Sequence, residues 1–443
     1  MSKLLAVSGI IIVGLLTISF VVEAESQTIK ALCLLWVIAV LWLTESLHIT
    51  VTALLVPVLA VFLGLLDVPA ALKQFSNPII FIFLGGFALA AAMHAQQLDK
   101  YLAHQILRFT AGRLNYAIIL ICFVTMILSM WISNTATVAV MLPLVLGMLS
   151  QREDLNYGSI AFALLGIAYS ANVGGIGTIV GSPPNAIVAA ELGMTFTDWL
   201  VIGMPISLLL WPLVLFVLAK LLKPDFAGQN VIIEDFHFYW SPDRKLLITI
   251  FLITVLGWLF SKPLGKLLEI TSGMDSWVAL LAIVLLAISG VVSWKSIEKS
   301  TDWGVLLLFG GGLTLSAVLK ETGASTYMGD VMSAFSSNFP TALVVLIIVA
   351  FVVFLTELTS NTATTALLVP IFVTLPVTLI SPEQAALAIG ISASCAFMLP
   401  VATPPNALVH GTGKLQQKTM MGAGFYLNIM CIFLITILLT LIY

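Results

Sequence analysis

The chain alternates long apolar stretches with short polar connections from one end to the other. Apolar runs of about 17 to 25 residues recur, and each is long enough to cross a hydrocarbon core of about 30 Å as a helix. This pattern predicts an all-α polytopic membrane protein with about eleven transmembrane helices. The expected spans lie near residues 4–22, 30–47, 49–66, 76–94, 158–191, 198–222, 245–261, 276–294, 303–320, 383–412 and 419–441.

Two further apolar stretches, 116–150 and 341–380, are each interrupted in the middle by Ser-Asn-Thr, and we interpret them as re-entrant helix hairpins. The amphipathic stretches before them, 97–113 and 321–337, are expected to lie in the membrane interface. The largest polar loop is expected to join two halves. The predicted organisation is an N-terminal transmembrane helix at 1–29, a first repeat at 30–222, a cytoplasmic linker at 223–245 and a second repeat at 246–443.

The first segment has some features of a cleaved signal peptide, because Lys3 precedes it and Val22-Glu23-Ala24 follows it. We expect it to be retained, since the run is long for a signal core and further spans follow at once.

Composition agrees with a chain that lies almost entirely in a membrane. Hydrophobic residues make up 60% of its 443 residues, charged residues make up 9%, and the mean hydropathy is +1.13. Soluble domains carry roughly a quarter charged residues. The net charge is -3, and the sequence has neither a basic tract nor a zinc-spaced set of Cys and His, so no nucleic acid partner is expected.

The distribution of Lys and Arg predicts the orientation. With the N-terminus in the cytoplasm, thirteen of the eighteen basic residues fall in cytoplasmic segments, as the positive-inside rule requires. The expected location is therefore a bacterial inner (plasma) membrane, crossed many times, with the C-terminus outside.

Three sequence blocks recur in the same order, offset by 221 to 227 residues. Five crossings are expected between the two Ser-Asn-Thr blocks, and this odd number makes the two repeats inverted. Inverted repeats with broken helices are typical of secondary transporters, whose substrate and ion sites lie near the midplane. The paired blocks are Leu84-Gly85-Gly86 with Phe309-Gly310-Gly311-Gly312, Ser133-Asn134-Thr135-Ala136-Thr137 with Ser360-Asn361-Thr362-Ala363-Thr364, and Gly181-Ser182-Pro183-Pro184-Asn185-Ala186 with Ala402-Thr403-Pro404-Pro405-Asn406-Ala407.

The Ser-Asn-Thr and Pro-Pro-Asn blocks are expected to break their helices, because their side chains compete with the backbone or remove a donor. Irregular backbone at membrane depth is tolerated where it lines a cavity or is buried in protein. Freed carbonyls and hydroxyls suit an alkali cation, and half-helix N-termini suit a carboxylate. Together they indicate a neutral site in which a bound cation compensates a bound anion.

Other polar and small residues in the apolar runs are interpreted as structural. The paired glycines at 85, 86, 311 and 312 are expected to be close helix contacts rather than ligands. Glu357 lies inside an apolar run, where a carboxylate is a functional hypothesis by default. Its repeat counterpart is Met130, so a hydrogen-bonding role is favoured over a proton or cation ligand.

At these blocks the sequence resembles the divalent anion:sodium symporter (DASS) family, and most closely its bacterial sodium-coupled dicarboxylate transporters. The resemblance implies import of a C4-dicarboxylate such as succinate, malate or fumarate with co-transported sodium, by a homodimer that works as an elevator. It implies no enzymatic activity. The sodium ligands it implies are Ser129, Ser133, Asn134 and Gly181 at one site and Thr356, Thr359, Asn361 and Ala402 at the other. The substrate-binding residues it implies are Ser133, Asn134, Thr135, Ser182, Ser360, Asn361, Thr362 and Pro404.

Other readings stay open at this point. The family includes sodium-independent exchangers, and the carried anion could be sulfate or citrate. A sodium/proton antiporter or an arsenite permease is expected to place a carboxylate at the crossing point. An intramembrane enzyme lacks support, because no Gly-x-Ser-x-Gly, His-Glu-x-x-His or intramembrane aspartate pair is found. A channel fits two asymmetric hairpins less well than alternating access does.

Overall fold

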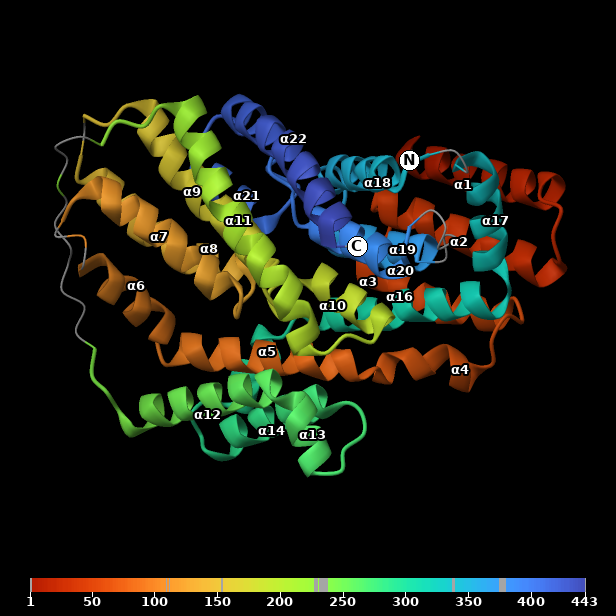
Figure 1. Cartoon of the computed structure of the whole chain (residues 1–443), viewed down its shortest axis with the longest axis horizontal. Helices are drawn as coiled ribbons and strands as arrows, with labels where there is room; N and C mark the ends of the chain where they lie inside the picture. Colours follow the sequence, from red (N-terminus) through yellow and green to blue (C-terminus); the bar gives the residue numbers. More distant parts are fainter. Residues whose placement is uncertain are drawn as a thin grey trace.

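The computed structural model consists of helices that mostly run along its longest axis (Figure 1). It describes residues 2–108, 110, 112–152, 154–226, 230, 238–336, 339–373 and 380–442. Within these residues there are twenty-two α-helices and one short 3-10 helix, and β pairing is limited to one isolated bridge between Arg113 and Asn230. The predicted all-α fold is therefore confirmed.

The two halves of the chain contain helices in the same order after α1 (Ser2–Val21). The first half comprises α2 (Ser26–Thr44), α3 (Ile49–Phe62), α4 (Val68–Lys73), η1 (Gln74–Ser76), α5 (Pro78–Ala95), α6 (Leu98–Arg108), α7 (Leu114–Ser129), α8 (Asn134–Ser150), α9 (Tyr157–Gly175), α10 (Pro183–Leu192) and α11 (Phe196–Leu222). The second half comprises α12 (Pro242–Leu259), α13 (Ser261–Leu267), α14 (Met274–Ile288), α15 (Trp294–Ser300), α16 (Trp303–Glu321), α17 (Ala324–Ser336), α18 (Thr341–Thr356), α19 (Asn361–Phe372), α20 (Pro382–Ala393), α21 (Pro404–His410) and α22 (Gln417–Ile442).

Every predicted span contains a helix, and the breaks occur at the predicted blocks. Both hairpins separate into two helices at Ser-Asn-Thr, and the spans near 158–191 and 383–412 separate before Pro-Pro-Asn. Six helices of the described part are long and apolar enough to cross a membrane alone, and α12 with α13 makes a seventh if this pair, bent by 84°, is one span. Seven shorter apolar helices of 10–17 residues accompany them.

Several boundaries differ from the prediction for local reasons. Helix α12 begins inside the expected linker, because the Ser241 hydroxyl caps its first turn by accepting from the Arg244 amide at 3.3 Å. The short helices α4, α13 and α15 were not predicted, since each is too short to show a clear period. Residues 227–229 and 231–237 of the expected linker, and 374–379 of the second hairpin, lie outside the described residues.

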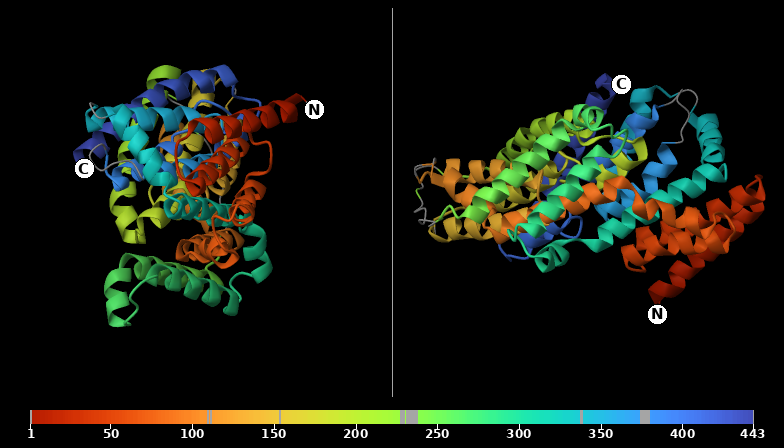
Figure 2. Two further views of the ribbon diagram at one scale, coloured as in Figure 1. Left: turned by 90° about the vertical axis from the view of Figure 1, so that its right-hand side faces the viewer. Right: turned by 90° about the horizontal axis from the view of Figure 1, so that it is seen from below.

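The glycine-rich helix of each half packs against a helix of the other half. Helix α3 of the first half packs against α16 of the second, and α14 of the second half packs against α5 of the first. A Cβ atom on Gly85 would lie 2.8 Å from the Cβ of Ala279, and one on Gly311 would lie 2.5 Å from the carbonyl oxygen of Ala53. These glycines are therefore close helix contacts, as predicted. Figures 1 and 2 show α12–α14 as a layer beside α5.

A left-handed turn joins each glycine-rich helix to the amphipathic helix that follows it. Gln97 has a φ of 58° between α5 and α6, and Gly323 has a φ of 72° between α16 and α17. The two residues are 226 positions apart, close to the offset between their helices. A side chain in this conformation costs about 1–2 kcal/mol, which glycine avoids. The first turn is therefore the more strained of the two.

The backbone just before each turn is held by the opposite half. The Gln96 carbonyl accepts a hydrogen bond of 3.0 Å from Arg244 Nε in the first turn of α12. The Thr322 carbonyl accepts one of 2.7 Å from the Thr28 hydroxyl in the first turn of α2. The start of α6 is thus attached to α12, and the start of α17 is attached to α2.

Candidate functional site

The first hairpin tip is closed by a short side-chain network. Helix α7 ends at Ser129, and Ser133 caps α8 by accepting a bond of 3.3 Å from the Ala136 amide. The fully buried Ser129 hydroxyl donates to Asn134 Oδ1 at 2.6 Å and lies 2.8 Å from the Ala171 carbonyl oxygen in α9. The tip is thereby attached to the broken helix of its own half.

The second tip has a network of the same kind. Ser360 caps α19, and the buried Thr356 hydroxyl donates to Asn361 Oδ1 at 2.5 Å. The same hydroxyl oxygen lies 3.1 Å from the carbonyl oxygen of Ala393 at the end of α20. Two tips that share sequence therefore also share contacts.

The asparagines of the two Pro-Pro-Asn blocks hold the breaks in shape. Asn185 Nδ2 donates to the carbonyl oxygens of Gly175 at 2.7 Å and Thr178 at 2.6 Å. In the second half Asn406 Nδ2 donates to the equivalent carbonyls, those of Ala396 at 3.0 Å and Leu399 at 3.1 Å. Sequence reasoning missed this role, although the exact recurrence of each asparagine after two prolines was the available signal.

In the first half the tip and the break meet closely. A Cβ atom on Gly175 would lie 2.5 Å from Asn134 Oδ1, and one on Gly181 would lie 3.0 Å from the Ser129 carbonyl oxygen. The structure therefore brings together Ser129, Asn134 and Gly181, three of the predicted sodium ligands. Their oxygens are neutral hydroxyl, amide and carbonyl groups, and backbone carbonyls at such breaks coordinate sodium in other transporters.

The second predicted cation site is less uniform. Thr356 and Asn361 are in contact, and the Ala402 amide donates to the Leu399 carbonyl at 3.2 Å in the adjoining break. The Thr359 hydroxyl, however, donates to the Leu355 carbonyl at 3.0 Å and lies 2.7 Å from Thr364 Oγ1. Its side chain is thus engaged inside the hairpin, which leaves its backbone carbonyl as the group for a ligand.

The predicted substrate residues differ in exposure between the halves. Ser133, Asn134, Ser360 and Asn361 are half-buried, and Thr135 is exposed whereas its counterpart Thr362 is buried. At the breaks, Ser182 is buried and Pro404 is exposed. The first tip is therefore the more open of the two.

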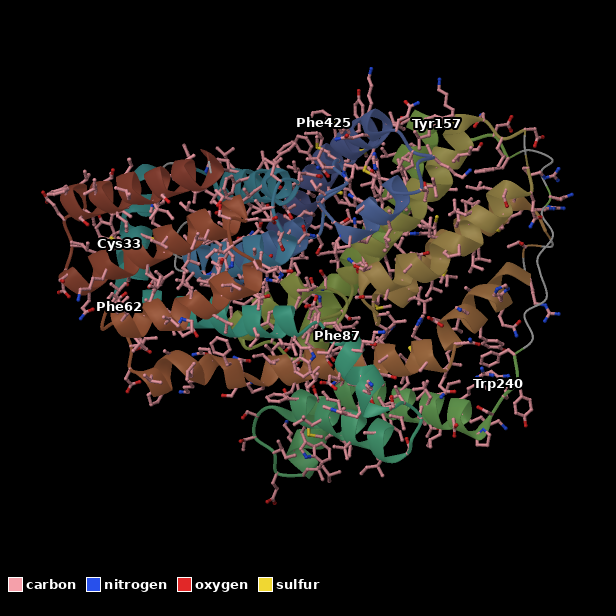
Figure 3. All side chains as sticks on the ribbon, turned by 180° about the vertical axis from the view of Figure 1, so that it is seen from behind. Cys33, Phe62, Phe87, Tyr157, Trp240 and Phe425 are labelled. Atoms are coloured by element: carbon pink, nitrogen blue, oxygen red, sulfur yellow. The ribbon has the colours of Figure 1, made fainter. Side chains whose placement is uncertain are left out.

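A cavity of about 630 Å³ adjoins this first tip. Ser133 lies on its wall, and the wall continues along α8 through Thr137 and Val140 and along α5 through Phe87 to His94. Phe87 is labelled near the middle of the molecule in Figure 3. At about 30 Å³ per water this volume holds roughly twenty waters. It is large enough for a hydrated small anion to reach the tip.

The halves are also joined directly at their breaks. Asn172 Nδ2 in α9 donates to Thr403 Oγ1 at 3.2 Å, and the Tyr169 hydroxyl donates to the Phe397 carbonyl at 2.5 Å. Helix α21 packs against α8, and α10 packs against α19. The four breaks therefore belong to one packed unit, as the repeat pattern predicts.

Glu357 has the hydrogen-bonding role that the sequence favoured. Only 3% of its surface is exposed, and its carboxylate accepts bonds from three consecutive backbone amides, at positions 397–399, and from Asn428 Nδ2. Its side chain is directed to the break between α20 and α21.

Comparisons with known proteins agree with this arrangement. Residues 39–379 match a protein family described as citrate transporter. A Haemophilus influenzae protein named as an uncharacterized transporter is 48% identical over 428 residues, which cover 94% of this chain and 92% of that protein. The sodium-dependent dicarboxylate transporter SdcS of Staphylococcus aureus is 34% identical over 429 residues, covering 89% and 82%. The YdaH transporter structure of Alcanivorax borkumensis has a TM-score of 0.61 at 14% identity, covers 93% of this chain and 97% of its own, and shares the fold.

Proposed function

The chain belongs to the divalent anion:sodium symporters, the family of the citrate and sodium-dependent dicarboxylate transporters, and we propose that it imports C4-dicarboxylates with sodium. Succinate, malate and fumarate are the proposed substrates. The observation that supports this most directly is the repeated network, Ser129 with Asn134 in one half and Thr356 with Asn361 in the other. Two similar networks, one at each hairpin tip, suit two cations with one dianion bound between them.

In this proposal two sodium ions bind neutral oxygens at the tips and breaks. The first site uses Ser129, Ser133, Asn134 and the backbone at Gly181, and the second uses Thr356, Thr359, Asn361 and the backbone at Ala402. With two cation sites, more than one sodium accompanies each dianion. The positive charge of the bound cations offsets the substrate's two carboxylates in a site that has no basic side chain at either tip.

The substrate is proposed to lie between the two tips. Its carboxylates meet the N-termini of α8 and α19, where Ser133, Asn134 and Thr135 begin one helix and Ser360, Asn361 and Thr362 begin the other. Free amides and the helix dipole favour an anion there. Ser182 and Pro404 are proposed to shape the selectivity from the breaks.

The proposed mechanism is alternating access by an elevator movement. The hairpins, the broken helices and the helix that follows each set, α7–α11 and α18–α22, form the moving part. The remaining helices form a scaffold that dimerises with a second copy. The proposed setting is a bacterial plasma membrane, with the N-terminus and the 223–245 linker in the cytoplasm and the C-terminus outside. The movement carries the cavity beside α8 from one face of the membrane to the other.

Citrate is the second candidate substrate, because the family match is to citrate transporters. Uptake of labelled succinate into proteoliposomes, challenged with unlabelled malate, fumarate, citrate and sulfate, distinguishes the candidates. The proposal expects malate and fumarate to compete more strongly than citrate or sulfate. Uptake that ignores sodium but requires succinate inside the vesicles would instead identify an exchanger.

A further inference from the structure

A carboxylate is buried directly beside the second tip. Glu357 follows the last residue of α18, and its Oε1 accepts from the Phe397 amide at 2.7 Å and the Met398 amide at 2.8 Å. Its Oε2 accepts from the Leu399 amide at 3.0 Å, and Asn428 Nδ2 in α22 donates to Oε1 at 2.7 Å. One side chain thus organises three consecutive amides of the break between α20 and α21.

The same break is held from its other side by Asn406. The side-chain amide of Asn406 donates to the Ala396 and Leu399 carbonyls. The backbone of the break is therefore held on both sides, because its N–H groups donate to Glu357 and its carbonyls accept from Asn406. The backbone at Ala402, which belongs to the proposed second cation site, follows three residues later. Glu357 therefore fixes the shape of one wall of that site.

The first half achieves the same shape without a charge. Met130 occupies the position equivalent to Glu357, and its backbone carbonyl accepts from the Thr178 hydroxyl, whose oxygen accepts from the Gly181 amide at 3.1 Å. The first break is thus held by a neutral hydroxyl, and the second is held by a carboxylate. The two halves of the site differ in charge although their tips are alike.

The four partners of Glu357 are all N–H donors. This environment suits a carboxylate anion, because the O–H of a carboxylic acid would need an acceptor. The neighbouring residue is Thr356, whose hydroxyl belongs to the network of the second tip. A negative charge on the residue next to one of the proposed ligands, in a buried environment, attracts a cation more than it would in water.

We infer that Glu357 is a positioning residue of the second cation site, and that its charge makes this site bind sodium more tightly than the first. The inference rests on the proposed function, because it takes sodium as the bound cation. In this inference Glu357 does not contact the ion directly. It holds the backbone of the break in position and contributes a negative charge to the electrostatic field at the site.

The test is a sodium titration of the full-length protein with two readouts. One is the melting temperature of purified protein as NaCl replaces choline chloride, and the other is the sodium dependence of succinate uptake into proteoliposomes. We expect Glu357→Gln to raise the half-saturating sodium concentration at least tenfold while uptake at saturating sodium largely recovers. Asn428→Ala, which removes one donor, should raise it about threefold. The matched variant Met130→Leu should leave it unchanged.

The inequality of the two sites needs one further pair of variants. Ser129→Ala weakens the first site and Thr356→Val the second, so the sodium-dependent melting of each reports the site that remains. We expect the site left in Ser129→Ala to bind sodium at least fivefold more tightly than the site left in Thr356→Val. The reverse order would overturn the inference.

The outcomes separate the inference from the proposed function. A folded Glu357→Gln protein with the sodium midpoint of the wild type would overturn the inference and leave the proposed function intact. A lower maximal rate with an unchanged midpoint would have the same meaning, since it indicates a general structural defect. If Glu357→Gln does not fold, an unchanged midpoint in Asn428→Ala would overturn it. A wild type with neither sodium stabilisation nor sodium-driven uptake would refute both.

Discussion

Gly175 gives the sharpest test of the proposed first cation site. Its α-carbon faces the Asn134 amide so closely that a Cβ atom would lie 2.5 Å from Oδ1 and 2.9 Å from Nδ2. Ordinary contacts begin near 3.4 Å, so Gly175→Ala must move the amide by about 0.9 Å. The hydrogen bond from Ser129, now 2.6 Å, would lengthen to about 3.5 Å and be lost.

The size of the effect follows from these displacements. Overpacking of a close contact costs about 1–3 kcal/mol of folding stability, whether or not sodium is bound. Loss of the buried hydrogen bond, worth about 1–3 kcal/mol, is expected to weaken the sodium site itself. Since about 1.4 kcal/mol is a factor of ten, we expect the half-saturating sodium concentration of Gly175→Ala to rise about 5- to 150-fold. The assay is the sodium dependence of succinate uptake into proteoliposomes, with the melting temperature measured in parallel.

Two matched variants make the result interpretable. Gly147→Ala introduces the same methyl group into α8 at a position with no other atom within 4 Å, so it should leave sodium dependence unchanged. Ala396→Gly alters the equivalent position of the second half, where a methyl group is native, and should change the midpoint by less than about threefold, since it displaces nothing. Wild-type sodium dependence in a folded Gly175→Ala protein would refute the placement of Asn134 at a cation site.

Three further predictions concern the neighbouring structure. Gln97→Gly should raise the free energy of unfolding by up to about 1 kcal/mol, because it relieves a left-handed side chain; a melting temperature below that of the wild type would contradict this. Asn185→Ala should lose uptake and destabilise the protein by about 2–5 kcal/mol, because two buried carbonyls lose their donor; retained uptake at normal expression would contradict it. Val140→Cys should react with a membrane-impermeant thiol reagent and the buried Val138→Cys should not, and equal reactivity would contradict the cavity.

The sequence predicted the places where helices break, and the reason is local chemistry. Proline cannot continue a helix, and Ser and Asn compete for its backbone, so the blocks at 133–135, 183–185 and their repeats mark the breaks without any tertiary information. Their duplication then distinguished the breaks of the proposed site from ordinary kinks. The spans follow from hydrophobic length, and the hairpins follow from a long apolar stretch with a Ser-Asn-Thr block at its middle.

What the sequence could not predict depends on long-range packing. Nothing in the pattern says that Asn185 turns back onto the carbonyls of its own loop, or that the Thr359 hydroxyl is engaged inside the second hairpin. The 84° bend between α12 and α13 and the left-handed turn at Gln97 are likewise decided by neighbouring helices. These features depend on which partner is near, and hydrophobic periodicity does not contain that information.

The duplicated site also shows where two repeats of one design have diverged. Gly175 and Gly181 in the first half correspond to Ala396 and Ala402 in the second, and Met130 corresponds to Glu357. The first break therefore leaves no room for a methyl group at Gly175 or Gly181, and the second is held by the Glu357 carboxylate. Two repeats that share their contacts need not bind a cation equally, because small changes beside the proposed ligands alter both the packing and the electrostatic field around them.

The most direct test of sodium-coupled dicarboxylate import is uptake of labelled succinate into proteoliposomes with an inward sodium gradient. The controls are equimolar potassium in place of sodium and the Asn134→Ala variant, which removes the amide that the proposal assigns to both the first cation site and the substrate. The account predicts uptake that requires sodium and falls to background in Asn134→Ala. Equal uptake in sodium and potassium, or full uptake by a folded Asn134→Ala protein, would contradict it.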